Sequence, residues 1–152
     1  MNQLLLDTRL IKDGEKLIID GIEFTDSILV KLIIDNVPCE KMEYLDIALV
    51  VFSELVRSLS GSGCYLIFTS ASGIADDGGW EGVKVNFDDN RVVWDFETED
   101  KNYHFEFDSH QYEREIKSFE KELAVLTQDV ELEPTEIFYP ETWLKGDGGN
   151  IF

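Results

Sequence analysis

The chain has 152 residues, of which 43% are hydrophobic and 12% aromatic, so it can fill the core of one ordinary domain. Asp and Glu total 32 against 13 Lys and Arg, and the resulting net charge of -19 repels nucleic-acid phosphates and anionic membranes. No apolar run approaches the ~18 residues of a membrane helix, and the first residues lack a secretory signal. Two cysteines, Cys39 and Cys64, are too few for a disulfide scaffold. We therefore expect a cytoplasmic protein that binds neither nucleic acid nor membrane.

The first third of the chain predicts short strands and turns. Residues 10–19 read as two strands around Asp13-Gly14, a dipeptide suited to a type I′ hairpin turn, and a second Asp-Gly at 20–21 bends the chain again. The almost continuous apolar run over 28–34 predicts a central strand that is covered on both faces. Pro38 is expected to end this segment, because proline cannot donate to a sheet ladder.

A helix is predicted over about 40–59, because apolar residues recur there at intervals of three and four. These residues are Leu45, Ala48, Leu49, Phe52, Leu55, Val56 and Leu59. The glycines at 61 and 63 would end the helix, and residues 65–69 would form a short strand.

The clearest pattern in the sequence is strict alternation of apolar and polar residues in three consecutive segments. It predicts a three-stranded antiparallel meander over about 82–107, with one aromatic face buried and one polar face toward water. The inward residues are expected to be Val83, Val85, Phe87, Val92, Trp94, Phe96, Tyr103, Phe105 and Phe107.

A second helix is predicted over about 109–127, beginning after the N-cap Asp108 with Gln111 three residues further on. Its apolar residues at 112, 116, 119 and 123 would cover the aromatic face of the meander. Prolines at 134 and 140 favour an extended arm after this helix. The expected fold is a single α+β domain over 1–145, with both helices packed on an antiparallel sheet and a frayed tail over 146–152.

The residues that usually carry catalysis are sparse. His104 lies on the predicted polar face and His110 in a first helical turn, and neither is near a nucleophile motif. Cys64 is best explained as a small buried residue. The acidic loop 76–79 lacks the alternating ligand spacing of an EF-hand. We therefore expect no enzymatic activity, no cofactor and no metal site.

The negative charge is concentrated in the middle of the chain. Residues 76–108 hold 11 acidic residues against Lys84, Arg91 and Lys101, a balance of -8. Since like charges that cluster destabilise a compact state, this cluster is interpreted as a surface that meets a basic protein partner, although solubility is a competing reason. The predicted contact residues are Asp76, Asp77, Trp80, Glu81, Asp88, Asp89, Asp95, Glu97, Glu99 and Asp100.

The layout from Asp76-Asp77-Gly78-Gly79-Trp80-Glu81-Gly82 through the meander to Tyr112-Glu113 resembles that of bacterial immunity proteins. These are small acidic inhibitors that are paired with polymorphic or contact-dependent toxins. The group includes unrelated folds, so the resemblance implies a role and no particular fold. It implies that the chain binds the catalytic domain of a cognate toxin and blocks its substrate cleft. Because the acidic cluster calls for a basic partner and nucleases carry cationic clefts that hold phosphate, a nuclease is the favoured toxin.

Two other functions stay open at this point. A nucleic-acid mimic encoded by a phage or plasmid would also be acidic, and would space its carboxylates like phosphates along an elongated body. An enzyme with an unfamiliar carboxylate site would instead need a concave pocket that holds strongly perturbed acids.

Overall fold

The structure is a computed structural model that describes residues 1–43, 45, 48–70, 82–98, 101–128 and 130–133. It confirms an α+β fold in which most strands pair antiparallel. No helix in these ranges combines the length and apolarity that crossing a membrane requires. The predicted tail over 146–152, and the arm beyond residue 133, lie outside the described residues.

The first sheet is built around one long apolar strand. Strand β4 (Ser27–Ile34) pairs antiparallel with β1 (Leu4–Ile11) over the whole of both strands, and parallel with β12 (Glu131–Glu133). Six of its eight residues are buried, which confirms the predicted central strand. Asp35 and Asn36 then adopt positive φ angles of 52° and 68°, so that β5 (Val37–Pro38) folds back onto the end of β4. The 3-10 helix η1 (Cys39–Lys41) follows.

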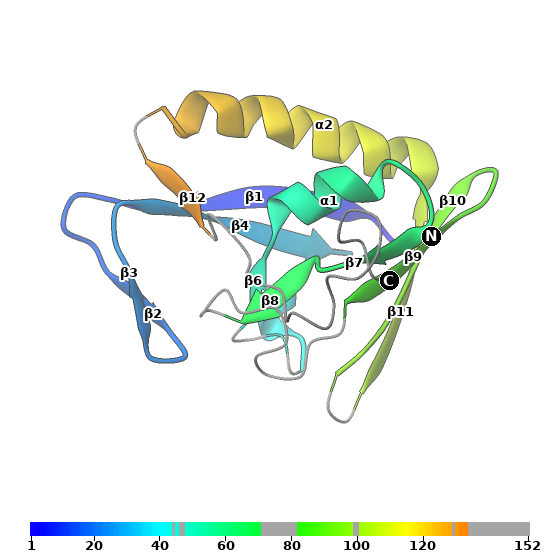
Figure 1. Cartoon of the computed structure of the whole chain (residues 1–152), viewed down its shortest axis with the longest axis horizontal. Helices are drawn as coiled ribbons and strands as arrows, with labels where there is room; N and C mark the ends of the chain where they lie inside the picture. The colour runs from blue at the N-terminus through cyan, green and yellow to red at the C-terminus, as the bar shows by residue number, and fades with distance from the viewer. Residues whose placement is uncertain (44, 46–47, 71–81, 99–100, 129, 134–152) are drawn as a thin grey trace, which may run out of the picture.

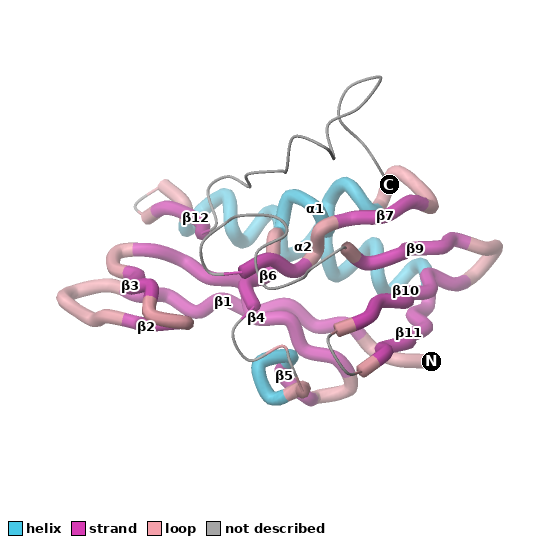
Figure 2. Tube along the Cα trace, turned by 60° about the horizontal axis from the view of Figure 1, so that its bottom comes forward, coloured by secondary structure: helices cyan, strands magenta, loops and turns pink. Residues whose placement is uncertain are grey.

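The prediction that residues 10–19 form a hairpin is wrong. Asp13 and Gly14 do form a turn with positive φ angles, but β1 before the turn pairs with β4. Strand β2 (Leu17–Ile19) instead pairs with β3 (Ile22–Phe24) around Asp20-Gly21, where φ is 49° and 80°. Both dipeptides suit the turn, and the long apolar partner β4 decides which strands pair. Figures 1 and 2 both show the β2–β3 hairpin at the opposite end of the molecule from the meander.

The helix predicted over 40–59 is much shorter than expected. Helix α1 spans Phe52–Ser58, and the preceding residues form strand β6 (Ala48–Val50), which pairs with β8 (Phe68–Ser70). The buried run from Leu49 to Phe52 is continuous, and such a run suits a buried strand as well as a helix. The β-branched Val50 and Val51 favour the strand. Helix α1 packs against β7 (Gly63–Tyr65) and α2.

The meander has the predicted strands, namely β9 (Val83–Phe87), β10 (Arg91–Glu97) and β11 (Asn102–Asp108). Strand β7 extends it to a four-stranded sheet in the order β11-β10-β9-β7. Trp94 at its centre has no exposed surface and meets the ring of Phe107 edge to face at a centroid distance of 5.0 Å. Phe105 points to the same aromatic face but is only partly buried, although Tyr103 and Phe107 on either side of it in β11 are buried.

Helix α2 spans Ser109–Leu126, close to the prediction, and the side chain of Asp108 caps it by accepting from the N–H of Gln111 at 2.9 Å. All four predicted apolar residues of α2 are buried. Tyr112 packs edge to face on Trp94 of the meander, whereas Phe119 packs on Phe52 of α1. Figure 1 shows α2 running from the end of the meander along β1 toward β12. The helix therefore joins the two sheets, and the opposite face of the meander is left to solvent.

Candidate partner-binding surface

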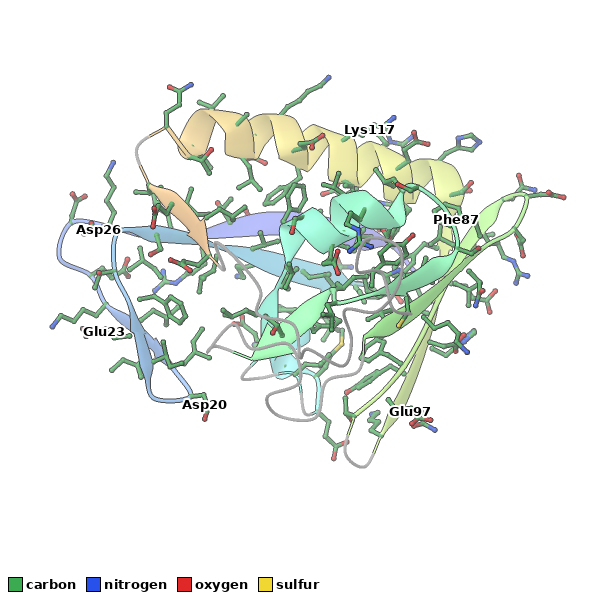
Figure 3. All side chains as sticks on the ribbon, in the orientation of Figure 1. Asp20, Glu23, Asp26, Phe87, Glu97 and Lys117 are labelled. Atoms are coloured by element: carbon green, nitrogen blue, oxygen red, sulfur yellow. The ribbon has the colours of Figure 1, made fainter. Side chains whose placement is uncertain are left out.

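The structure describes four of the ten predicted contact residues. Asp88 and Asp89 lie in the β9–β10 turn, and Asp95 and Glu97 lie on β10. Figure 3 shows Glu97 near the free end of the β10–β11 ribbon. The other six predictions lie outside the described residues. They are Asp76, Asp77, Trp80, Glu81, Glu99 and Asp100.

Alternation along β10 and the pairing register assemble one solvent-facing surface. Asp95 stands directly between Lys84 of β9 and His104 of β11, while Val93 stands between Asn86 and Glu106. We call this surface the polar face. Its members are Lys84, Asn86, Arg91, Val93, Asp95, Glu97, Asn102, His104 and Glu106.

A continuous chain of ion pairs crosses the polar face. Nη2 of Arg91 binds Oδ2 of Asp88 at 2.7 Å, and Nη1 of Arg91 binds Oε1 of Glu106. The other carboxylate oxygen of Glu106 lies 3.1 Å from Nε2 of His104, and Nδ1 of His104 lies 2.6 Å from Oδ1 of Asp95. We call the chain Asp88–Arg91–Glu106–His104–Asp95 the charge ladder. Alternation in the sequence placed Asp95, His104 and Glu106 on one face, but only the strand register makes them neighbours.

The ladder shifts the pKa values of Asp88, Glu106 and His104 in the direction that favours their charged forms. Hydrogen bonds to Asp95 and then to Glu106 raise the pKa of His104, because both carboxylates stabilise the imidazolium. Hydrogen bonds from His104 and from Arg91 lower the pKa of Glu106 in turn. A hydrogen bond from Arg91 likewise lowers the pKa of Asp88. All of these groups are substantially exposed to solvent, so the ladder orders side chains more than it stabilises the fold.

The described part of the acidic segment is less negative than the whole. Residues 82–98 and 101–108 hold six of the 11 acidic residues and all three bases, which leaves a balance of -3. Five acidic residues, at 76, 77, 81, 99 and 100, account for the rest and lie outside the described ranges. Within the described ranges, Asp89 and Glu97 take part in no ion pair, so their carboxylates face solvent without a cation.

Some aspartates elsewhere in the chain have a structural use in turns, which the sequence indicated for Asp13 and Asp20 but not for Asp26 and Asp35. Asp13, Asp20, Asp26 and Asp35 all adopt positive φ angles between 46° and 58°, a conformation that Asp tolerates better than most residues. The side chain of Asp35 also accepts from the N–H of Gln3 at 2.8 Å, and hydrogen bonds lower its pKa. Figure 3 shows Asp20, Glu23 and Asp26 around the β2–β3 hairpin, far from Glu97. For Asp35, the dipeptide Asp35-Asn36 was the signal that could have predicted the turn.

The described residues show little that is arranged for reaction chemistry. They contain no group of three or more His, Cys, Asp or Glu side chains placed to hold a metal ion. Burial raises the pKa of the Cys39 thiol to about 11, so this thiol stays protonated and is a poor nucleophile. Cys64 is half-buried on β7 and His110 is exposed on α2. The geometry of the polar face suits binding, and the absence of enzymatic activity stays a prediction.

Comparison of the chain with protein families, with curated proteins and with solved structures gave no match.

Proposed function

We propose that this protein is an acidic inhibitor that binds a basic protein partner, namely an immunity protein for a toxin with a cationic catalytic domain. The charge ladder is the observation that carries the proposal. It holds charged side chains in place on an exposed face of a sheet whose other face is packed on Trp94 and Tyr112. Because these side chains are already ordered, less conformational entropy is lost when a partner binds.

The mixture of charges on the polar face favours a protein partner over a mimic of nucleic acid. Lys84 and Arg91 stand among the carboxylates, so the face is not a uniform row of negative charge like a phosphate backbone. A surface of mixed sign is complementary to one particular arrangement of partner charges, and it disfavours wrong partners through like-charge contacts. Asp89 and Glu97 remain available to partner cations, and so does Oδ2 of Asp95.

A nuclease is the favoured target because such enzymes need a cationic cleft to hold phosphates. An acidic domain seated over that cleft would exclude the substrate and inhibit without any chemistry of its own. Its action would take place in the cytoplasm, where the toxin's substrate lies. Electrostatic attraction would mainly accelerate encounter, and the effect would weaken with salt.

The proposal is tested with a toxin domain recovered by affinity capture and then purified. The measurement is the rate at which its catalytic activity is lost on mixing, at low and high salt. We compare the double variant Asp89→Asn/Glu97→Gln with the control double variant Asp13→Asn/Asp20→Asn. Both remove two charges, and asparagine is suited to the positive φ angles at 13 and 20.

We expect the double variant Asp89→Asn/Glu97→Gln, which changes the polar face and the adjoining β9–β10 turn, to associate about tenfold more slowly at low salt and the control to change much less. The difference should shrink as salt rises past about 0.15 M. Equal rates for the two variants would remove the polar face from the interface. A captured partner whose activity is not inhibited would overturn the inhibitor role itself.

A further inference from the structure

Both ring nitrogens of His104 face carboxylates. Nδ1 lies 2.6 Å from Oδ1 of Asp95 and Nε2 lies 3.1 Å from Oε2 of Glu106. An ionised carboxylate is only an acceptor, and a neutral imidazole has a single N–H to donate. Two such hydrogen bonds therefore require the doubly protonated imidazolium. When the ring loses a proton, one of the two carboxylates loses its donor.

We propose that His104 makes partner binding by the polar face dependent on pH, by occupying Asp95 and Glu106 when protonated and releasing one of them when neutral. The part of this inference that concerns a biological partner rests on the proposed function. The titration of His104 itself does not. Release would leave the face with one more negative charge and with a carboxylate oxygen free to accept from a guanidinium or ammonium group.

The other charged groups around His104 are carboxylates, a guanidinium and an ammonium, types of group whose ordinary pKa values lie well away from neutral pH. On β10 these are Asp95, Glu97 and Arg91, and on β9 Lys84 stands opposite Asp95. On β11 itself Glu106 is the neighbour, and it is also paired with Arg91. On the outer side of β11, the N-terminal segment brings Asn2, which pairs with Phe107, and the α-amino group of Met1, whose charge contributes to lowering the pKa of Asp35. Among the described members of the polar face, His104 is therefore the one whose ordinary pKa lies near neutral pH.

The first experiment follows the ring resonances of His104 by NMR across this pH range in the whole protein. We expect a titration midpoint above the ordinary value of about 6.5, and a lower midpoint in each of the variants Asp95→Asn and Glu106→Gln. His110 is the internal reference, because it lies on α2 away from the ladder. A midpoint at or below 6.5, or one that both variants leave unchanged, would overturn the proposal.

The second experiment measures the affinity of a nona-arginine peptide at about pH 5.5 and 8.5 in low salt. We expect the wild-type protein to bind several times more tightly at the higher pH, by about threefold to fivefold for one added charge close to a bound cation. His104→Gln should lose most of this pH dependence. The matched control His110→Gln removes the same titrating group elsewhere and should retain it.

A His104→Gln variant with the same pH dependence as wild type would contradict the proposal, as would a wild-type protein with none. Neither measurement needs a biological partner. If no inhibited toxin domain is found but both results are as expected, the proposed function fails and the pH-dependent surface stands. If a toxin domain is inhibited but His104 titrates at its ordinary value, only this inference fails.

Discussion

The side-chain amide of Gln111 on α2 contacts both backbone polar groups of Leu4 on β1: Nε2 donates to the carbonyl oxygen at 2.6 Å, and Oε1 accepts from the N–H at 3.1 Å. One turn further along α2, the carboxylate of Glu115 accepts from the N–H of Leu6 at 2.9 Å. Strand β1 is an edge strand whose other side is paired with β4. The helix thus satisfies backbone groups that would otherwise offer a template for a further strand.

Gln111→Ala should destabilise the protein by about 1–3 kcal/mol, because it leaves two part-buried backbone groups of Leu4 without partners. Urea unfolding measures this loss. Lys117→Ala on the exposed side of the same helix is the control and should cost much less, because its ion pair with Glu113 is exposed to solvent and contributes little. Equal losses for the two variants would show that Gln111 does not support β1.

Tyr112 is the centre of a fully buried polar contact between three elements. Its hydroxyl lies 2.6 Å from Oγ of Ser58 on α1 and accepts from Nε1 of Trp94 on β10 at 3.3 Å. Tyr112→Phe keeps the ring packing but leaves the indole N–H unpaired, so we expect a loss of about 1–3 kcal/mol in the free energy of unfolding. A variant as stable as wild type would contradict this role.

Burial also raises the pKa of Tyr112 to about 12. In a spectroscopic titration, Tyr112 should therefore remain protonated at a pH where an ordinary tyrosine, with a pKa near 10, is half ionised. Tyr112→Phe should leave the phenolate signal of the folded protein near pH 10 unchanged. Loss of signal there would show that the hydroxyl reaches solvent.

Glu54 on α1 is a buried carboxylate that contacts both a backbone N–H and a charged side chain. Its Oε1 accepts from the N–H of Leu66 at 3.0 Å, and its Oε2 pairs with Arg57 at 2.5 Å. Glu54→Ala leaves the buried N–H of Leu66 without its acceptor, so we expect it to lower the free energy of unfolding by about 1–3 kcal/mol. Glu54→Gln keeps an acceptor oxygen and should lower it less. Thermal unfolding of both variants shows which one is less stable. A larger loss of stability in Glu54→Gln than in Glu54→Ala would contradict this role of Glu54.

The contribution of His104 to stability should depend on pH. Its pKa is raised in the folded protein, so the stabilisation is fully present below the unfolded value of about 6.5 and is lost as pH rises through the folded value. We therefore expect wild type to exceed His104→Gln in melting temperature more at pH 6 than at about pH 9. A difference that grows with pH would contradict the assigned ion pairs.

Two aromatic residues of β11 should respond differently to truncation. Phe107 is completely buried, and Phe107→Ala should cost about 3–5 kcal/mol. Phe105 lies on the same face but is partly exposed, so Phe105→Ala should cost less than that. Chemical denaturation measures both, and equal losses would show that the edge of β11 is covered.

The meander and helix α2 could be predicted from the sequence because each depends on local periodicity. Alternation from Val92 to Phe96 places every second side chain on one face, and the cap at Asp108 places the start of α2. The strand over Ala48–Val50 could not be predicted, because a short continuous apolar run suits either structure until a partner strand is present.

The sequence alone therefore determined which residues of β10 and β11 face water, including His104 and Asp95. The tertiary structure decided which of them are neighbours. The register that sets Asp95 against His104 is chosen when the aromatic face closes on Trp94 and α2, since a slip of one residue would expose that whole face. Gln111, whose side chain contacts the backbone of Leu4, lies more than a hundred residues away in the chain, and local pattern carries no information about such contacts. Packing over the whole chain selects them.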